Sequence, residues 1–209
     1  DQRLLDEADI LMQKRDFHDA YEKAKEAKDE LNLLVKDSPK NVDFSLLYIR
    51  SCLSLFLSEN TLILEGFPND PKSLVPIIDI NKYLNYKDTI QVALDLLKEI
   101  KDHKMTTQQK SSYYTLYGSI LCLNPEYLSL SSEEYYKAIA STKQWLEELK
   151  TAQKQSILSV VRVKNQLIAL QLALTEVLLD SHSWEEALTV LENTVAKKDL
   201  KYFDANFSL

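Results

Sequence analysis

Glycine is the residue that most constrains this chain, because only two glycines, Gly66 and Gly118, occur in 209 residues. Average usage near 7% would give about fifteen. Hairpin turns and phosphate-binding loops both depend on glycine, which adopts positive φ angles without strain. The sequence therefore predicts an all-α fold and argues against sheets and phosphate-binding loops.

Apolar residues recur at helical spacing through most of the chain. A first series ends at residues 14–16, and a second begins at Phe17, which predicts two amphipathic helices joined by a tight turn. A third helix, over residues 42–58, is apolar on nearly every side, so we expect it to be the most buried element of the N-terminal half. Further helices are predicted over 86–104, 110–123, 133–149, 154–180 and from Trp184 onward.

Two stretches interrupt this spacing. Residues 59–80 contain Gly66 and three of the five prolines, which indicates a long irregular insertion. Residues 124–132 end in two serines, which we expect to cap a helix that starts at Glu133.

One pattern of large and small residues recurs along the chain. Near the C-terminus the positions are Thr175, Leu178, Trp184, Ala187, Leu191 and Thr194. The same steps separate Ala8, Leu11, Phe17, Ala20, Ala24 and Ala27. A third copy contains Gly118, Leu121, Tyr135, Ala138, Thr142 and Trp145, and a weaker fourth contains Ile90, Ala93, Leu97 and Ile100.

At these positions the chain resembles the tetratricopeptide repeat family, in which helical hairpins stack with small residues at the helix crossings. The resemblance implies one continuous helical-hairpin superhelix, an α-solenoid, over residues 1–209. It also implies that Trp184 fills the joint between two helices and that Ala187 is small because a helix passes against it. The alanine positions are 73, 45 and 49 residues apart, whereas the family unit has about 34, so repeats of about 40–47 residues remain an alternative.

The charge and cysteine content favour an intracellular protein, cytoplasmic or nuclear. A net charge of −7, with basic residues scattered among acidic ones, argues against a dedicated nucleic-acid binder. Cys52 and Cys122 lie in apolar helical patterns, which indicates free thiols in a reducing compartment. The N-terminus lacks a signal-peptide pattern. The stretch most like a membrane span, residues 44–64, is interrupted by Arg50 and Glu59, so we expect no membrane segment.

Residues 197–209 begin what looks like another repeat, with apolar side chains that a further helix would cover. We therefore expect this chain to be a fragment of a longer protein, or its end to be covered by a partner.

No arrangement of residues in the sequence indicates catalysis, so we expect a protein that is not an enzyme and that has no metal or cofactor. The three histidines have no metal ligand at a suitable spacing. The acidic pairs Glu133–Glu134 and Glu185–Glu186 fall in the predicted first turns of helices, where carboxylates offset the helix dipole.

The resemblance implies a non-catalytic scaffold or adaptor for protein–protein interaction, with a groove lined by the first helix of each repeat. An acidic or mixed groove suits a basic or apolar peptide or helix of a partner protein. The alternative is an obligate structural subunit of a larger regulatory or RNA-processing assembly. The positions that match the groove are Asp9, Met12, Gln13, Thr115, Ser119, Leu172, Glu176 and Asp180.

Overall fold

The computed structural model describes residues 2–34, 40–65, 80–151 and 157–194, and all regular secondary structure in these ranges is helical. The predicted all-α class is confirmed for this part of the chain. The chain divides into two compact units, unit 1 from Asp1 to Met105 and unit 2 from Thr106 to Leu209. The continuous superhelix remains a prediction.

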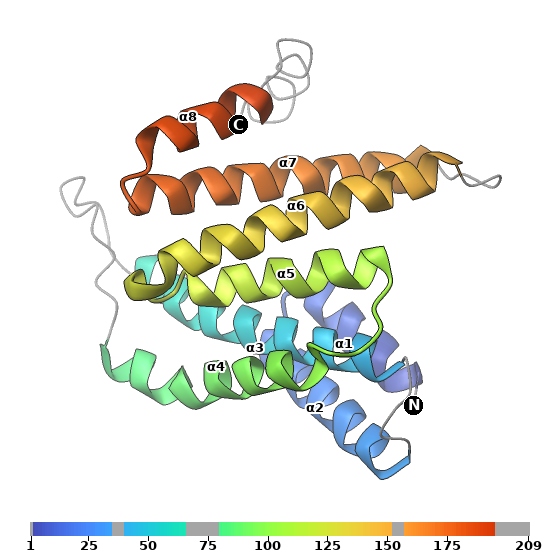
Figure 1. Ribbon diagram of the computed structural model, residues 1–209. Coiled ribbons are helices and arrows are strands. Elements are labelled where there is room, and N and C mark those ends of the chain that lie inside the picture. The colour runs from blue at the N-terminus through green and yellow to red at the C-terminus, as the bar shows by residue number, and fades with distance from the viewer. Residues whose placement is uncertain (1, 35–39, 66–79, 152–156, 195–209) are drawn as a thin grey trace. The chain divides into compact units, whose positions relative to one another are not determined.

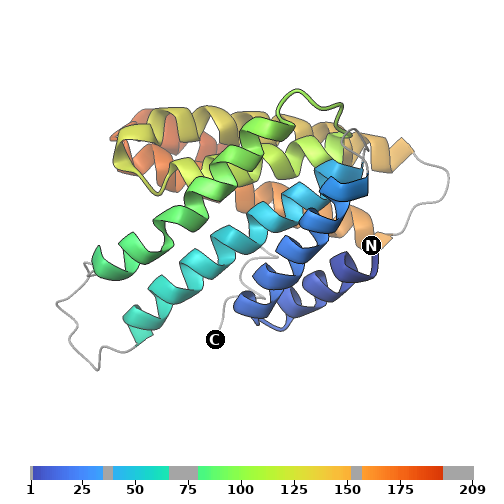
Figure 2. The same ribbon diagram turned by 90° about the horizontal axis from the view of Figure 1, so that it is seen from below.

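Unit 1 contains α1 (Gln2–Gln13), α2 (Phe17–Leu34), α3 (Lys40–Glu65) and α4 (Ile80–Ile100). Consecutive helices pack together, and α1 also contacts α3 (Figure 2). α3 contributes more buried side chains than the other described helices of this unit, as its apolar sequence predicts. Residues 59–65 belong to α3 and are therefore helical rather than irregular, whereas 66–79 lie outside the described residues.

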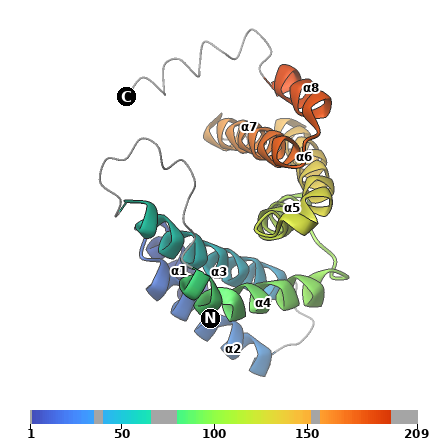
Figure 3. The ribbon, with the colours of Figure 1, turned by 90° about the vertical axis from the view of Figure 1, so that its left-hand side faces the viewer.

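Unit 2 contains α5 (Thr107–Leu121), a 3-10 turn η1 (Pro125–Tyr127), α6 (Leu128–Thr151), α7 (Ile157–Asp180) and α8 (Trp184–Thr194). The helices α5 to α8 pack in chain order, each against the next (Figure 1). The end-on view shows them as successive members of one row (Figure 3). Thr106 caps α5 by accepting a hydrogen bond from the backbone N–H of Gln109, which accounts for the start of this helix.

The start of α6 differs from the predicted one. Asn124 caps η1 through a hydrogen bond from the backbone N–H of Glu126, and the chain enters α6 directly at Leu128. Ser131 therefore lies inside the helix, where its hydroxyl donates to the carbonyl of Gly118 over 2.8 Å. The predicted serine cap is wrong, because this serine joins α5 to α6 instead.

The expected position of the Glu133–Glu134 pair is wrong for the same reason. α6 begins at Leu128, so the pair does not lie in its first turn. Glu134 is buried and accepts a hydrogen bond from Lys137 at 2.6 Å. The pair Glu185–Glu186 does lie in the first turn of α8, as predicted.

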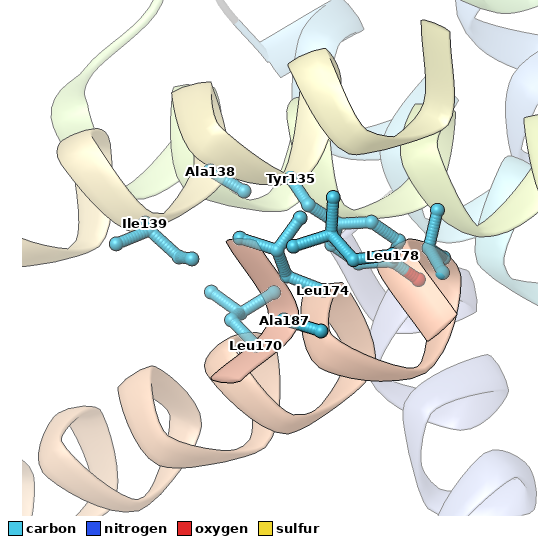
Figure 4. Packing of buried hydrophobic residues seen from close by; sticks show 8 residues of the cluster. Tyr135, Ala138, Ile139, Leu170, Leu174, Leu178 and Ala187 are labelled. Carbon is cyan, nitrogen blue, oxygen red and sulfur yellow. The ribbon is translucent and has the colours of Figure 1, made fainter. Parts of the chain in front are cut away.

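Small residues lie at the crossings of α5, α6, α7 and α8. Ala138 on α6 is 0% exposed and Ala187 on α8 is 1% exposed. They belong to one apolar cluster with residues of α7, including Leu170, Leu174 and Leu178 (Figure 4). A β-carbon on Gly118 would lie 3.1 Å from the ring of Tyr135, so any larger residue here would push this ring away from its present position.

The turn between α1 and α2 and the turn between α7 and α8 have the same hydrogen bonds. Arg15 and His182 have φ angles of 61° and 60°, the left-handed conformation that ends many helices. The next residue in each turn, Asp16 or Ser183, donates its N–H to the carbonyl five residues earlier, at 3.0 Å and 2.8 Å. Both turns are Schellman motifs whose last residue also starts the following helix. The first and last copies of the sequence pattern are therefore hairpins with the same turn.

We expect His182→Gly to raise the free energy of unfolding by about 0.5–1 kcal/mol. The left-handed conformation costs a non-glycine residue roughly 1–2 kcal/mol, and the larger conformational entropy that glycine loses on folding offsets about 0.5–1 kcal/mol of this gain. Urea unfolding of the full chain measures the change. His182→Ala is the matched control and should not stabilise, because alanine retains the β-carbon; a gain of the same size for both would assign the effect to the imidazole rather than to the backbone.

Trp184 does not fill the joint between helices. Its side chain is 58% exposed, and its ring lies against that of His182 with centroids 5.5 Å apart. The buried side of α8 contains Ala187 and Thr194, and at 100° per residue Trp184 lies about 60–80° away from these two residues. Ala187 is therefore buried as predicted, whereas Trp184 is not.

Candidate partner-binding surface

Three of the predicted groove residues lie on one face of α7. Leu172 is half-buried, and Glu176 and Asp180 are exposed, each one turn after the previous one. Burial first, and then the charges of Asp180 and Glu176, raise the pKa of the Cys122 thiol at the end of α5. The two carboxylates therefore lie close enough to α5 to act on Cys122.

Ser119 and Thr115 occupy the same region of α5 with different partners. The hydroxyls of Ser119 and Tyr135 are 2.9 Å apart, and burial raises the pKa of Tyr135 to about 12, opposed by this hydrogen bond. Thr115 donates to the carbonyl of Ser111 on its own helix, at 2.7 Å. Ser119 thus joins α5 to α6 beside the acidic end of α7, while the hydroxyl of Thr115 is bonded within its own helix.

The remaining predicted residues belong to unit 1 and do not form an open acidic surface. Asp9 pairs with Arg50 at 3.8 Å and accepts a hydrogen bond from Gln13 at 3.2 Å. Met12 is only 8% exposed. The prediction that Met12 contacts a partner is wrong, because helical spacing places this side chain on the packed side of α1. Gln13 is exposed.

A larger apolar surface surrounds the acidic residues of α7, and reasoning from the sequence missed it. Val161 is 47% exposed and Leu179 is 40% exposed, while Ile168 and Leu172 are half-buried. We call Val161, Arg162, Ile168, Leu172, Glu176, Leu179 and Asp180 the open face of α7. The signal was present in the sequence, because α7 is apolar on more sides than two neighbouring helices can cover.

The first turn of α7 extends this apolar surface. Ile157 and Leu158 are 82% and 80% exposed. In length and composition alone α7, rather than residues 44–64, is the helix within the described ranges that could cross a membrane. One side of α7 packs on α6 and α8 in the structure. The apolar residues of α7 therefore form a buried side, which packs on α6 and α8, and also an exposed side.

A second apolar stripe lies on α8. Trp184, Leu188 and Leu191 are 58%, 56% and 37% exposed and follow helical spacing. Tyr136 of α6 donates a hydrogen bond over 2.6 Å to Glu186, on another side of α8. The stripe is thus left uncovered by the described neighbours of α8.

The chemically reactive groups are buried or scattered. Burial raises the pKa of the Cys52 thiol to about 12, so this thiol is protonated near neutral pH. Among the residues that the structure describes, no group of three histidine, cysteine or acidic side chains could hold a metal ion. A surface depression between α1 and α2 is lined mainly by charged residues, of which Lys23 and Glu26 pair at 2.8 Å. The open face of α7 and the stripe on α8 each contain two or more exposed large apolar side chains.

No protein-family model matches this chain, and neither a curated protein nor a solved structure matches it significantly. The resemblance to tetratricopeptide repeats therefore remains an inference from the residue pattern.

Proposed function

We propose that this protein is a non-catalytic scaffold or adaptor for protein–protein interaction, built from tetratricopeptide-like helical hairpins. Two observations support the repeat. The turns at Arg15 and His182 share their backbone geometry and hydrogen bonds, and the small residues Ala20, Ala138 and Ala187 are all buried at helix contacts. Stacked hairpins of this kind present extended surfaces to partner proteins.

The observation that carries the proposal is the open face of α7. A contiguous patch of exposed apolar side chains that is bordered by charged residues is typical of an interaction site rather than of an ordinary protein surface. Leu172 and Leu179 supply apolar contact, and Glu176 and Asp180 border them with negative charge. The partner that suits this end of the face is an amphipathic helix with apolar residues on one side and basic residues at its edge.

The second candidate is an obligate structural subunit of a larger assembly, for example a regulatory or RNA-processing complex. The stripe of Trp184, Leu188 and Leu191 on α8 favours it, because a second uncovered apolar surface is more than a single transient site requires. In that case the chain alone aggregates, and it becomes soluble when expressed with its partner.

The double variant Glu176→Lys with Asp180→Lys should weaken partner binding without lowering thermal stability. Both carboxylates are exposed, and isolated surface charges contribute at most about 1 kcal/mol to folding. The variant loses both the electrostatic attraction and the fixed register that the two carboxylates give to the complex. The dissociation constant should therefore rise about tenfold or more at low ionic strength and less at high salt.

Affinity capture with the wild-type chain and the variant in parallel identifies the partner, and titration then measures Kd at two salt concentrations. The matched control is Glu133→Lys with Glu192→Lys, which makes the same change in net charge at exposed positions on α6 and α8. Equal loss of binding in both variants would indicate a net-charge effect, and no loss in either would exclude the open face of α7 as the site.

A further inference from the structure

The four apolar residues of the open face have a spacing that reads the same in both directions. Val161, Ile168, Leu172 and Leu179 are separated by seven, four and seven residues, so the centre of the series is Leu170. Steps of three and four that add to seven are those of a helix that packs along another helix over several turns. A stripe with this symmetry fits an identical stripe that runs in the opposite direction.

The charged residues of the open face are also arranged around Leu170. The positive charge lies before this residue, and the negative charges lie after it. Arg162 is exposed eight residues before Leu170, while Glu176 and Asp180 are exposed six and ten residues after it. All three lie on the same flank of the apolar stripe, at 100° per residue. In an antiparallel pair of identical helices this flank faces its own copy. Arg162 of one chain then lies between the Glu176 and Asp180 side chains of the other, and the contact occurs twice.

We propose that the open face of α7 binds the open face of a second copy of this chain, with the two helices antiparallel around Leu170. Val161 then packs on Leu179 of the other copy, and Ile168 packs on its Leu172. A single symmetric partner satisfies both the apolar stripe and charges of both signs, whereas a purely basic partner helix would leave Arg162 facing a like charge. This inference rests on the proposed function, since it assigns the partner of the same surface.

The expected association is weak. A helix of 24 residues is about 36 Å long, and one pair of such helices buries less than the roughly 1,200–2,000 Å² of a standard interface. The chain should therefore exchange between monomer and dimer at micromolar concentrations.

Sedimentation velocity of the full chain over a range of concentrations tests the association. The wild-type chain should dimerise, and Arg162→Glu should raise the dimer dissociation constant at least about tenfold, because each substitution is present twice in a symmetric interface. Glu176→Arg with Asp180→Arg should have the same effect. Combining the three substitutions should restore the dimer, and no other partner predicts this restoration. Circular dichroism confirms that each variant is folded.

Cysteine cross-linking tests the antiparallel register. Ala169 and Asn165 are both exposed. Around a centre at residue 170, the two copies of position 169 are about 3 Å apart along the helix axis, and those of position 165 about 15 Å apart. Ala169→Cys should therefore form an intermolecular disulfide under mild oxidation, and Asn165→Cys should not. Cross-linking at Asn165→Cys but not at Ala169→Cys would indicate a parallel pair and overturn the proposal, because in a parallel pair this flank does not face its own copy.

The other outcomes separate this inference from the proposed function. A wild-type chain that stays monomeric at several hundred micromolar overturns the dimer. If Glu176→Lys with Asp180→Lys still abolishes capture of a different protein, the scaffold function stands. A dimer that persists in all the charge variants is formed elsewhere and also overturns the inference. Retention of a monomer on phosphatidylcholine vesicles, lost in Val161→Ser with Leu179→Ser, would assign the face to a bilayer and overturn both.

Discussion

Leu174→Ala is expected to lower the free energy of unfolding by about 2–5 kcal/mol, the range for deleting a fully buried leucine side chain. Leu174 is 0% exposed and lies in the apolar cluster formed by α6, α7 and α8 (Figure 4). Its neighbours Ala138 and Ala187 have no side-chain freedom with which to fill the cavity. The loss should therefore fall in the upper half of this range.

Trp184→Ala is the matched control, and its expected cost is under about 1 kcal/mol. The tryptophan side chain is far larger than leucine, but it is 58% exposed and contacts His182 at the surface, so its removal leaves no internal cavity. Urea unfolding of both variants, with the slope compared as well as the midpoint, measures the two costs. A cost for Trp184→Ala as large as that for Leu174→Ala would place the tryptophan in a helix joint, as the repeat resemblance implies.

The contrast between these two residues shows which part of the fold the sequence predicts. Ala187 is buried because a small residue is the only one that allows two helices to approach at that point, and such a requirement appears directly in the sequence. Trp184 meets no equivalent requirement, because its position depends on the rotation of α8, which the turn at His182 determines. Helical spacing predicts the existence of an element more reliably than the direction in which a residue at its edge points.

The boundaries of α6 illustrate a second limit. Two serines before an acidic pair are a typical helix start, yet α6 begins at Leu128 and contains both serines. The hydrogen bond from Ser131 to the carbonyl of Gly118 explains the difference, because a contact with α5, more than ten residues away, determines the role of that serine. Local sequence signals do not include such a contact.

The candidate site was predicted in part for a related reason. The repeat resemblance implies that Leu172, Glu176 and Asp180 line a groove, and their spacing of four residues places them on one face of α7. The apolar remainder of the open face was not predicted, because an apolar residue is expected to be buried until the positions of the neighbouring helices are known. Met12 was misassigned for the opposite reason, since its buried position depends on the packing of α1.

Unit 1 holds a partly buried ion pair, and its lysine connects three of the helices. Lys28 of α2 is 3% exposed, and its ammonium group donates to the hydroxyl of Ser45 on α3 at 2.9 Å and to Glu99 on α4 at 3.1 Å. A buried ammonium group is costly unless a carboxylate and hydrogen-bond acceptors surround it. The side chain of Glu99 is 49% exposed, so water also reaches this end of the pair and reduces its strength.

Glu99→Gln is expected to lower the free energy of unfolding by about 1–3 kcal/mol, less than the roughly 3–5 kcal/mol found when a fully buried pair loses one partner. Glutamine retains an oxygen that accepts from Lys28, so the loss reports the charge rather than the hydrogen bond. Lys28→Met should cost less, because an apolar side chain of similar length removes the buried charge together with the need for a partner.

A double-mutant cycle separates these effects, with unfolding of the wild-type chain, both single variants and the double variant measured by urea. Glu99→Gln should cost almost nothing when Lys28→Met is already present, because the carboxylate then has no buried charge to compensate. If Glu99→Gln costs the same in both backgrounds, Glu99 stabilises α4 independently of Lys28. Its connection to α2 would then contribute nothing measurable to unit 1, and the apolar contacts of α3 alone would hold α4 in place.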